Sequence, residues 1–485
     1  MFVNINVNQK VKQYIENNLL FGNKLTPELF AILTVYFVQG ILGLARLAVS
    51  FFLKDDLQLS PAEVSALMGV ASIPWITKPI IGFLSDGKPL LNYRRRSYLI
   101  LSGIMGTIAW ASLATFVDTL WGAVIAILGT SLSVAMSDVI VDSVVVERAK
   151  VESLEKSGSL QSITWGMSSL GGLITAYFSG SLLEHFSNNQ VFLITACFPL
   201  IVVAVASLII EQPVSEANPI EPFKGQVKQL WQTLKQKTIL APVVFIFLWQ
   251  STPSGESAFF FFTTNELGFT PEFLGRIRLV TSLAALIGIW SYQKWLKQVS
   301  FRVILGWSVV LSSLLGLTSL LLVTHTNRLI GIDDHWFSLG DSLILTVMGQ
   351  IAFMPVLVLS ARLCPKGIEA SFFALLMSIW NLGGLVSHEL GAILTSWLGV
   401  TETNFEHLWL LLLITNLSTL LPLPLLKFVP NDDPQKVAGE NQEVNLPVAE
   451  VFEHQITGAM TANTMPEVVM DVTKIPVGKS DKSSS

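Results

Sequence analysis

The chain has 485 residues and a formal net charge of −5; 13% of its residues are charged and 51% are hydrophobic. Soluble domains contain about 25% charged residues, so this composition argues against a soluble enzyme. The absence of a basic footprint argues against a nucleic-acid-binding protein. The composition predicts a polytopic membrane protein in contact with a lipid bilayer.

The apolar segments predict twelve membrane spans, because a bilayer core requires about 20 mostly apolar residues per helix. Polar residues 1–27 form an expected cytoplasmic segment without a cleavable signal peptide. An N-terminal half, 28–210, and a C-terminal half, 239–427, flank a cytoplasmic linker, 211–238. The acidic tail, 428–485, is expected to be disordered and cytoplasmic. The expected spans are 28–53, 64–85, 97–117, 120–147, 160–183, 190–210, 239–264, 274–296, 302–324, 338–362, 370–398 and 406–427.

The distribution of lysine and arginine predicts the orientation of these spans. Sixteen such residues fall in the internal loops on the side of the N-terminus, and four fall on the other side. The positive-inside rule therefore places both termini in the cytoplasm of a cell with this protein in its plasma membrane. A plastid envelope is the alternative if the source is a plant.

The two halves carry related sequence at a constant spacing. Residues 57–63 (LQLSPAE) match 267–273 (LGFTPEF), 210 positions later, and 170–173 (LGGL) match 382–385 (LGGL), 212 positions later. Ser60 and Thr270, each followed by proline, are expected to cap the second helix of their halves. A parallel six-plus-six repeat is the architecture of major facilitator transporters, with a substrate site between the halves near the midplane. The predicted fold is therefore all-α.

A loop motif follows the second span. Residues 82–88 (GFLSDGK), followed by arginines 94–96, resemble the G-x-x-x-D loop signature of the major facilitator superfamily. Gly82, Asp86, Arg94 and Arg95 are therefore candidate gate residues, since a small residue lets helices approach and an aspartate can cap a neighbouring helix. A solvated loop end is the alternative interpretation.

The chain resembles one family within this superfamily, the folate–biopterin transporters. The resemblance rests on Lys78-Pro79 with the motif just described, on residues 137–147 (SDVIVDSVVVE), and on Gly171-Gly172. The compact members from cyanobacteria and plastid envelopes are the most similar. The resemblance implies secondary active transport of folates and pterins, coupled to protons or to exchange.

Two other functions remain open from the residues alone. A major facilitator carrier for another organic anion or amphiphile keeps the fold and changes the cargo. An integral-membrane enzyme is more remote, because the six histidines are scattered and no phosphate-binding loop is present. We expect no cofactor, no metal and a monomer.

Charged residues inside the expected spans are candidate functional groups, because burying an unpaired charge in a membrane is costly. Asp138 and Asp142 share one face of the fourth span, at a depth similar to that of Lys78. Lys78 is a candidate substrate-binding residue. Two carboxylates facing one lysine leave one acid available for proton coupling; a structural ion pair is the alternative. Glu389, beside His388, is a weaker coupling candidate.

Arg46 and Glu256 are 210 positions apart and therefore occupy equivalent places in the first and seventh spans. Pro253 and Gly255 interrupt the seventh span, and non-helical backbone at membrane depth occurs only against protein or a wet cavity. Arg46 could bind a substrate carboxylate or pair with Glu256. Snorkelling of Arg46 toward the membrane surface is the alternative.

Four further residues are candidates for substrate contact. Arg276 and Arg278, at the mouth of the eighth span, could attract an anionic substrate, or could be interfacial anchors. Trp75 and Trp249 lie well inside their spans and could stack on a flat pterin ring. For either tryptophan, ordinary packing is the alternative.

Overall fold

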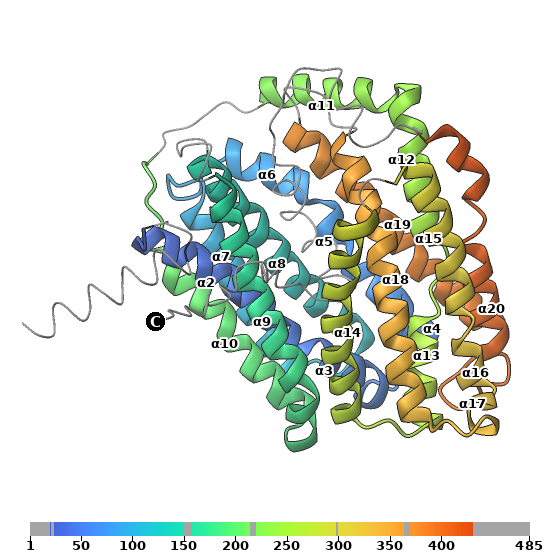
Figure 1. The fold of residues 1–485 in the computed structure, drawn as a ribbon. Helices are drawn as coiled ribbons and strands as arrows, with labels where there is room; N and C mark the ends of the chain where they lie inside the picture. The colour runs from blue at the N-terminus through green and yellow to red at the C-terminus, as the bar shows by residue number, and fades with distance from the viewer. Residues whose placement is uncertain are drawn as a thin grey trace, which may run out of the picture.

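The structure is a computed structural model that describes residues 20, 24–149, 157–213, 220–296, 299–362 and 369–429. Within these residues the regular structure is helical, apart from one isolated bridge between Leu90 and Tyr93. Figure 1 shows the long helices running alongside one another, with α11 (Ile220–Leu234) lying across one end. We call this end the linker end and the opposite one the far end. The tail from residue 430 lies outside the described part of the chain.

The helices follow the predicted spans closely. The first part of the chain contains α2 (Pro27–Ile41), η2 (Leu42–Leu44), α3 (Ala45–Phe51), η3 (Phe52–Asp56), α4 (Pro61–Ala71), α5 (Ile73–Ile76), α6 (Lys78–Gly87), α7 (Arg96–Thr115), α8 (Leu120–Ala149), α9 (Ser157–His185) and α10 (Asn188–Ala206). After α11 come α12 (Lys237–Gln250), α13 (Glu256–Phe261), η4 (Phe262–Glu266), α14 (Pro271–Ser291), η5 (Tyr292–Leu296), α15 (Phe301–Gly316), α16 (Ser319–Val323), α17 (Thr326–Leu329), α18 (Asp334–Arg362), α19 (Glu369–Trp397), α20 (Leu408–Ser418) and η6 (Leu423–Phe428).

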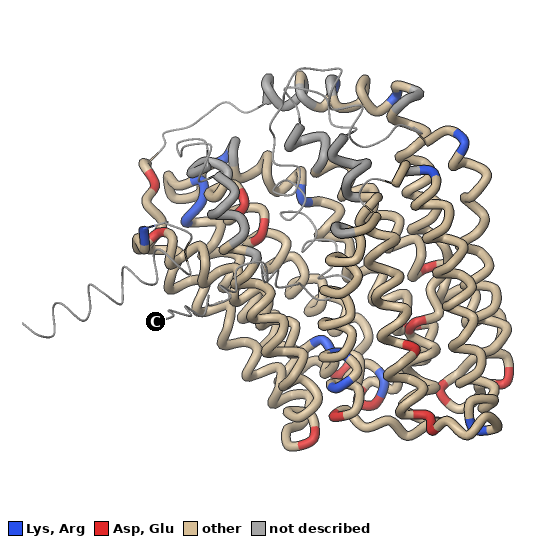
Figure 2. Tube along the Cα trace, in the orientation of Figure 1, with Lys and Arg blue, Asp and Glu red and all other residues tan. Residues whose placement is uncertain are grey.

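The molecule is a multi-pass membrane protein. Within the described residues, nine helical segments are long and apolar enough to cross a bilayer. The predicted spans 160–183, 239–264 and 370–398 are helical but are not among these nine, so the predicted number of twelve is not confirmed. Figure 2 shows that charged residues are sparse along the middle of most helices and gather toward both ends.

Local sequence signals explain where several helices begin and break. Ser60 caps α4 through a capping box with Glu63, and Thr270 caps α14, which confirms both predicted caps. The seventh predicted span breaks between α12 and α13, as Pro253 and Gly255 predicted. The second predicted span also breaks, into α4, α5 and α6, and prolines stand in the first turns of α5 and α6.

The internal repeat extends to unusual backbone features. The five-residue π-helical turns η3 and η4 begin at Phe52 and Phe262, 210 positions apart. Gln58 and Gly268, also 210 positions apart, have positive φ angles of 53° and 67°. π-turns are rare and often occur at functional sites. Figure 1 places α3 and α13, the helices that precede these turns, at the far end.

Helix packing brings distant segments of the chain together through small residues. In the first part of the chain, α2 packs along α9, and a Cβ atom at Gly40 would lie 2.8 Å from the nitrogen of Gly172. Two helix pairs, α9–α14 and α4–α19, join the first part of the chain to the second. At the first of them, a Cβ atom at Gly275 would lie 2.9 Å from Cα of Gly180. These approaches position both parts of the chain around a shared interior space.

Candidate functional site: a cavity with a charged and a neutral end

A cavity of about 570 Å³ lies in this shared space. Its lining comes from both parts of the chain, including α2, α3, α4, α5, α8 and α9 from the first and α12, α13, α14, α18 and α19 from the second. The volume falls within the range of roughly 300–1,000 Å³ that is typical of small-molecule sites. This cavity lies inside a membrane protein and is lined by residues of both parts of the chain, so it is the candidate substrate site.

One region of the cavity is charged. Arg46, Glu256 and Arg278 line it, and Glu256 lies close enough to both arginines to attract them electrostatically. The Nη1 atom of Arg278 is buried and has no hydrogen-bond partner among the described residues. One carboxylate, that of Glu256, therefore faces two guanidinium groups.

A second carboxylate, Asp341, also lines the cavity and is held by hydroxyl groups. Asp341 accepts hydrogen bonds from the Thr318 hydroxyl at 2.5 Å and the Ser319 hydroxyl at 3.2 Å. His388 also lines the cavity, and its Nδ1 atom is buried without a partner in the described chain. The cavity lining therefore contains Asp341 and His388 as ionisable side chains in addition to Arg46, Glu256 and Arg278.

The other region is neutral and polar, with aromatic rings. Gln39, Trp75, Gln250, Trp380 and Asn381 line it. The Gln39 side chain is 6% exposed, and its Nε2 atom has no hydrogen-bond partner among the residues described. The Asn381 amide donates to the backbone oxygen of Trp75 at 3.4 Å and so fixes the tryptophan backbone. An amide and an indole ring suit an uncharged heterocycle.

Lys78, Asp138 and Asp142 lie beside this neutral end rather than in the cavity lining. Lys78 Nζ lies 2.5 Å from Asp138 Oδ2 and 4.3 Å from the centroid of the Trp75 ring. Asp142 instead accepts a hydrogen bond from the Tyr36 hydroxyl. Asp138 and Asp142 therefore have different partners: the first is neutralised by an ammonium group, and the second is held by a phenol.

The structure does not bring three other candidates into the cavity lining. Trp249 packs between Phe245 and Trp380, with ring centroids 6.5 Å and 6.1 Å away. Arg276 is 66% exposed and pairs with Glu272 one turn earlier on α14. Glu389 lies at the α4–α19 contact, where its Oε1 atom would be 2.9 Å from a Cβ atom at Gly69.

The gate candidates lie at the linker end, on α6 and in the loop before α7. The backbone N–H groups of Arg94 and Arg95 donate to the Glu211 carboxylate at 2.5 Å and 3.0 Å, and the Arg95 guanidinium donates to Ser85 at 3.1 Å. A Cβ atom at Gly82 would lie 3.6 Å from Val139, an ordinary contact with α8. The side chain of Asp86 lies outside the described part of the structure.

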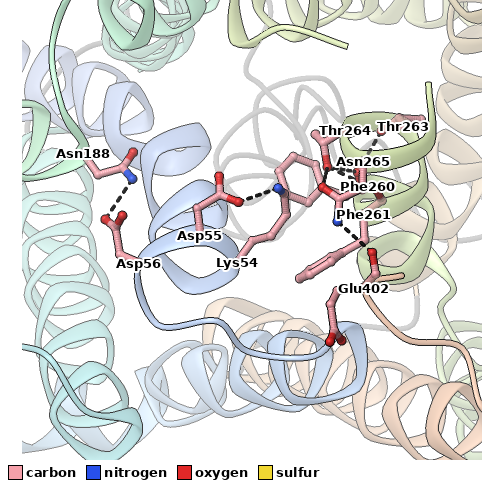
Figure 3. A network of polar contacts seen from close by, with 10 residues as sticks. All are labelled: Lys54, Asp55, Asp56, Asn188, Phe260, Phe261, Thr263, Thr264, Asn265 and Glu402. Carbon is pink, nitrogen blue, oxygen red and sulfur yellow. Dashed lines mark hydrogen bonds and ion pairs between the residues drawn. The ribbon is translucent and has the colours of Figure 1, made fainter. Parts of the chain in front are cut away.

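The far-end wall of the cavity is an aromatic and polar cluster that joins the two parts of the chain (Figure 3). Phe51 of α3 meets Phe260 of α13 edge to face with centroids 5.4 Å apart, and Phe260 also lines the cavity. Lys54 Nζ lies 2.5 Å from Asp55 and 5.8 Å from the Phe261 ring centroid. Further contacts in Figure 3 are Asn188 to Asp56 at 3.0 Å and Asn265 to the Glu402 carbonyl at 2.8 Å.

Sequence reasoning missed several of these residues. Gln39 and Tyr36 are uncharged, so a search for ionisable groups in apolar segments does not find them. Asp341 lies near the start of its predicted span and gives no signal of burial. The repeat gives a signal for two others: Lys54 lies within the π-turn η3 and Phe261 directly precedes the π-turn η4, and the two turns begin 210 positions apart.

Solved structures with the same arrangement of helices are transporters. A mutant form of the nucleoside transporter NupG matches with a TM-score of 0.65 at 13% identity, over 83% of this chain and 100% of that chain. The D-xylose–proton symporter matches with a TM-score of 0.59 at 16% identity, over 83% of this chain and 98% of that chain. The chain therefore has the all-α major facilitator fold, as predicted.

The particular family follows from sequence similarity. Residues 39–446 match the BT1 family, and the chain belongs to this family. It is 60% identical over 467 residues to the folate-biopterin transporter of Synechocystis, covering 94% of both chains. It is 32% identical to the probable folate-biopterin transporter 2 of Arabidopsis thaliana, over 85% of this chain and 86% of that one. Folate transporter 2 of Plasmodium falciparum is 30% identical, over 83% and 89%. These findings confirm the predicted resemblance and identify a transporter, not an enzyme.

Proposed function

We propose that this protein is a secondary active transporter that carries folates and related pterins across a membrane by alternating access. The observation that carries the proposal is the 60% identity, over 94% of both chains, to a relative named for folate and biopterin. The cavity supports it chemically, because an arginine-containing region and an aromatic, amide-containing region suit the two ends of a folate.

The proposed transport cycle uses two six-helix halves, 28–210 and 239–427, with twelve spans in all. The pairs α9–α14 and α4–α19 connect these halves, and the cavity lies between them. In this proposal, the edge-to-face contact between Phe51 and Phe260 closes the far end. Rocking of the halves would break this contact and bring the linker-end gate residues together.

Each substrate-binding candidate has a proposed role that depends on its position. Arg46 and Arg278 bind anionic groups of the substrate, and Glu256 balances part of their charge. Trp75 contacts the heterocyclic ring of the substrate, and Lys78 packs over the Trp75 ring. Arg276, which is exposed, attracts anions toward the site; Arg276→Gln should slow uptake at low ionic strength and have little effect at high ionic strength.

Proton coupling is assigned to Asp142 in this proposal. Asp138 is already paired with Lys78, whereas Asp142 has only the neutral Tyr36 hydroxyl as its described hydrogen-bond partner. A carboxyl group without a fixed counterion can gain and lose a proton during a transport cycle. Glu389, at the moving α4–α19 contact, is the second candidate.

The proposed orientation places the linker end in the cytoplasm, because the lysine and arginine residues of the loops concentrate there. Both termini then face the cytoplasm. The proposed location is the plasma membrane, with a monomer as the transporting unit. The contact of Glu211 with the backbone of Arg94 and Arg95 would hold the loop motif at the cytoplasmic surface.

Uptake into sealed vesicles tests this function. Vesicles that contain the full-length protein should accumulate labelled folate, biopterin should compete, and Arg46→Ala should abolish accumulation. Collapsing the pH gradient in a parallel sample should abolish accumulation against a gradient if protons drive it; persistence would indicate exchange. Uptake of a different organic anion without competition by folate would refute the substrate assignment, and vesicles without the protein provide the background.

A further inference from the structure

We infer that the cavity binds its substrate in one direction, with the heterocyclic ring toward the linker end at Gln39 and Trp75 and the anionic tail toward the far end at Arg278. This inference rests on the proposed function and adds the orientation of the substrate and the residue that recognises each of its halves.

The depths of these residues follow from the repeat. α4 and α14 both begin at the far end with equivalent caps, and Trp75 lies 14 residues beyond Pro61, whereas Arg278 lies seven residues beyond Pro271. At 1.5 Å per residue, this difference places Trp75 about 10 Å closer to the linker end. The first span gives a similar separation, since Gln39 and Arg46 are seven residues apart. This length is comparable to the distance that the methylene and aminobenzoyl groups together set between the pterin ring and the glutamate of a folate.

The linker-end region can recognise a pterin through its amide. A pterin edge carries both donors and acceptors, and a primary amide such as that of Gln39 can pair with it in the same way. The Gln39 Nε2 donor is buried and unpaired in the described chain, so a substrate acceptor would satisfy it. Trp75 offers a rigid aromatic surface beside it, held by Lys78 and by Asn381.

The far-end region can recognise a carboxylate through Arg278. Arg278 lines the cavity, and its buried Nη1 atom has no partner among the residues that the structure describes. Glu256 has a second arginine to balance, and Asp341 is occupied by Thr318 and Ser319. A guanidinium group forms two-point hydrogen bonds with a carboxylate, which the glutamate tail of a folate provides.

A crossed set of ligands and variants tests the direction. Biopterin contains the ring without the anionic tail, p-aminobenzoylglutamate contains the anionic tail without the ring, and folate contains both. Gln39→Leu should weaken biopterin binding roughly five- to tenfold and leave p-aminobenzoylglutamate unchanged. Arg278→Gln should weaken p-aminobenzoylglutamate about 10- to 100-fold and leave biopterin unchanged, and each variant should weaken folate.

Binding is measured with the purified full-length protein by competition against labelled folate. For each variant the unaffected ligand reports correct folding, and Arg278→Lys gives a second test: an ammonium group should recover only part of the p-aminobenzoylglutamate binding. Equal losses for all ligands in folded variants would refute separate recognition of the two halves, and the opposite pattern would refute the direction. If the unmodified protein bound none of the three ligands, the proposed function would fail together with this inference.

Discussion

The ion pair between Lys78 and Asp138 allows a test that separates a structural role of the pair from a role in transport. The Nζ–Oδ2 distance is 2.5 Å, and the two side chains are only 20% and 9% exposed. Replacing Lys78 with methionine would leave the Asp138 carboxylate buried without its cation. Losing one partner of a buried pair typically costs about 3–5 kcal/mol, so we expect Lys78→Met to reduce the unfolding free energy by that amount.

The double variant separates the two interpretations. Lys78→Met combined with Asp138→Leu removes both charges, and apolar replacements of buried ion pairs are often neutral or stabilising. We therefore expect the double variant to recover at least about 1–3 kcal/mol of the loss. If the pair only holds α6 against α8, folate uptake should recover as well; if Lys78 takes part in transport, the double variant should be stable but inactive.

Unfolding in mixed detergent micelles measures the unfolding free energy of each variant. Uptake of labelled folate into vesicles measures its transport activity. Asp138→Asn alone serves as the matched control, since it keeps the size of the side chain and removes only its charge. The reasoning would be wrong if Lys78→Met lost less than about 1 kcal/mol, or if the double variant were as unstable as Lys78→Met.

Three further predictions concern helix packing, the far end and the Asp142 carboxylate. Gly40→Ala should destabilise the protein by about 1–3 kcal/mol, because its Cβ atom would lie 2.8 Å from a backbone nitrogen of α9. Gly349→Ala, whose Cβ atom would have no atom within 4 Å, should be tolerated. Thermal unfolding of both variants tests this prediction. Lys54→Met should loosen the far-end cluster and speed the labelling of a cysteine at Ser50, which lines the cavity, by a membrane-impermeant reagent; an unchanged rate would contradict a closing role. Tyr36→Phe should cost about 1–3 kcal/mol, since the buried carboxylate of Asp142 loses its described donor; unchanged stability in micelles would show that another group replaces the hydroxyl.

The fold could be predicted from the sequence because each of its main determinants is local. Apolar length marks the spans, and Ser60 with Pro61 and Glu63 marks a helix start through side chains within one turn. The break at Pro253 and Gly255 could be predicted for the same reason. The breaks in the second span were missed although its prolines signal them, because apolar length alone suggested one continuous helix.

The site was only partly predictable because it depends on which side of a helix faces the interior. Arg276 and Arg278 are two residues apart, so their side chains point about 200° apart around the helix axis, and only Arg278 reaches the cavity. Sequence spacing gives this angle but not the direction of the interior. Gln39 could not be recognised at all, since an amide in an apolar segment becomes informative only when its neighbours in space are known.

The helix contacts at Gly40 and at Gln250 differ in what lies between the two helices. At Gly40, α2 lies backbone against backbone on α9, with no side chain between them. Its counterpart 210 positions later is Gln250, whose long side chain lies against Gly383 in the seam between α12 and α19. A seam without side chains has no rotamers to exchange and must move as a block, whereas an amide can swing and let its helices slide. Deformation during turnover should therefore concentrate in the second bundle, leaving the first as the more rigid frame.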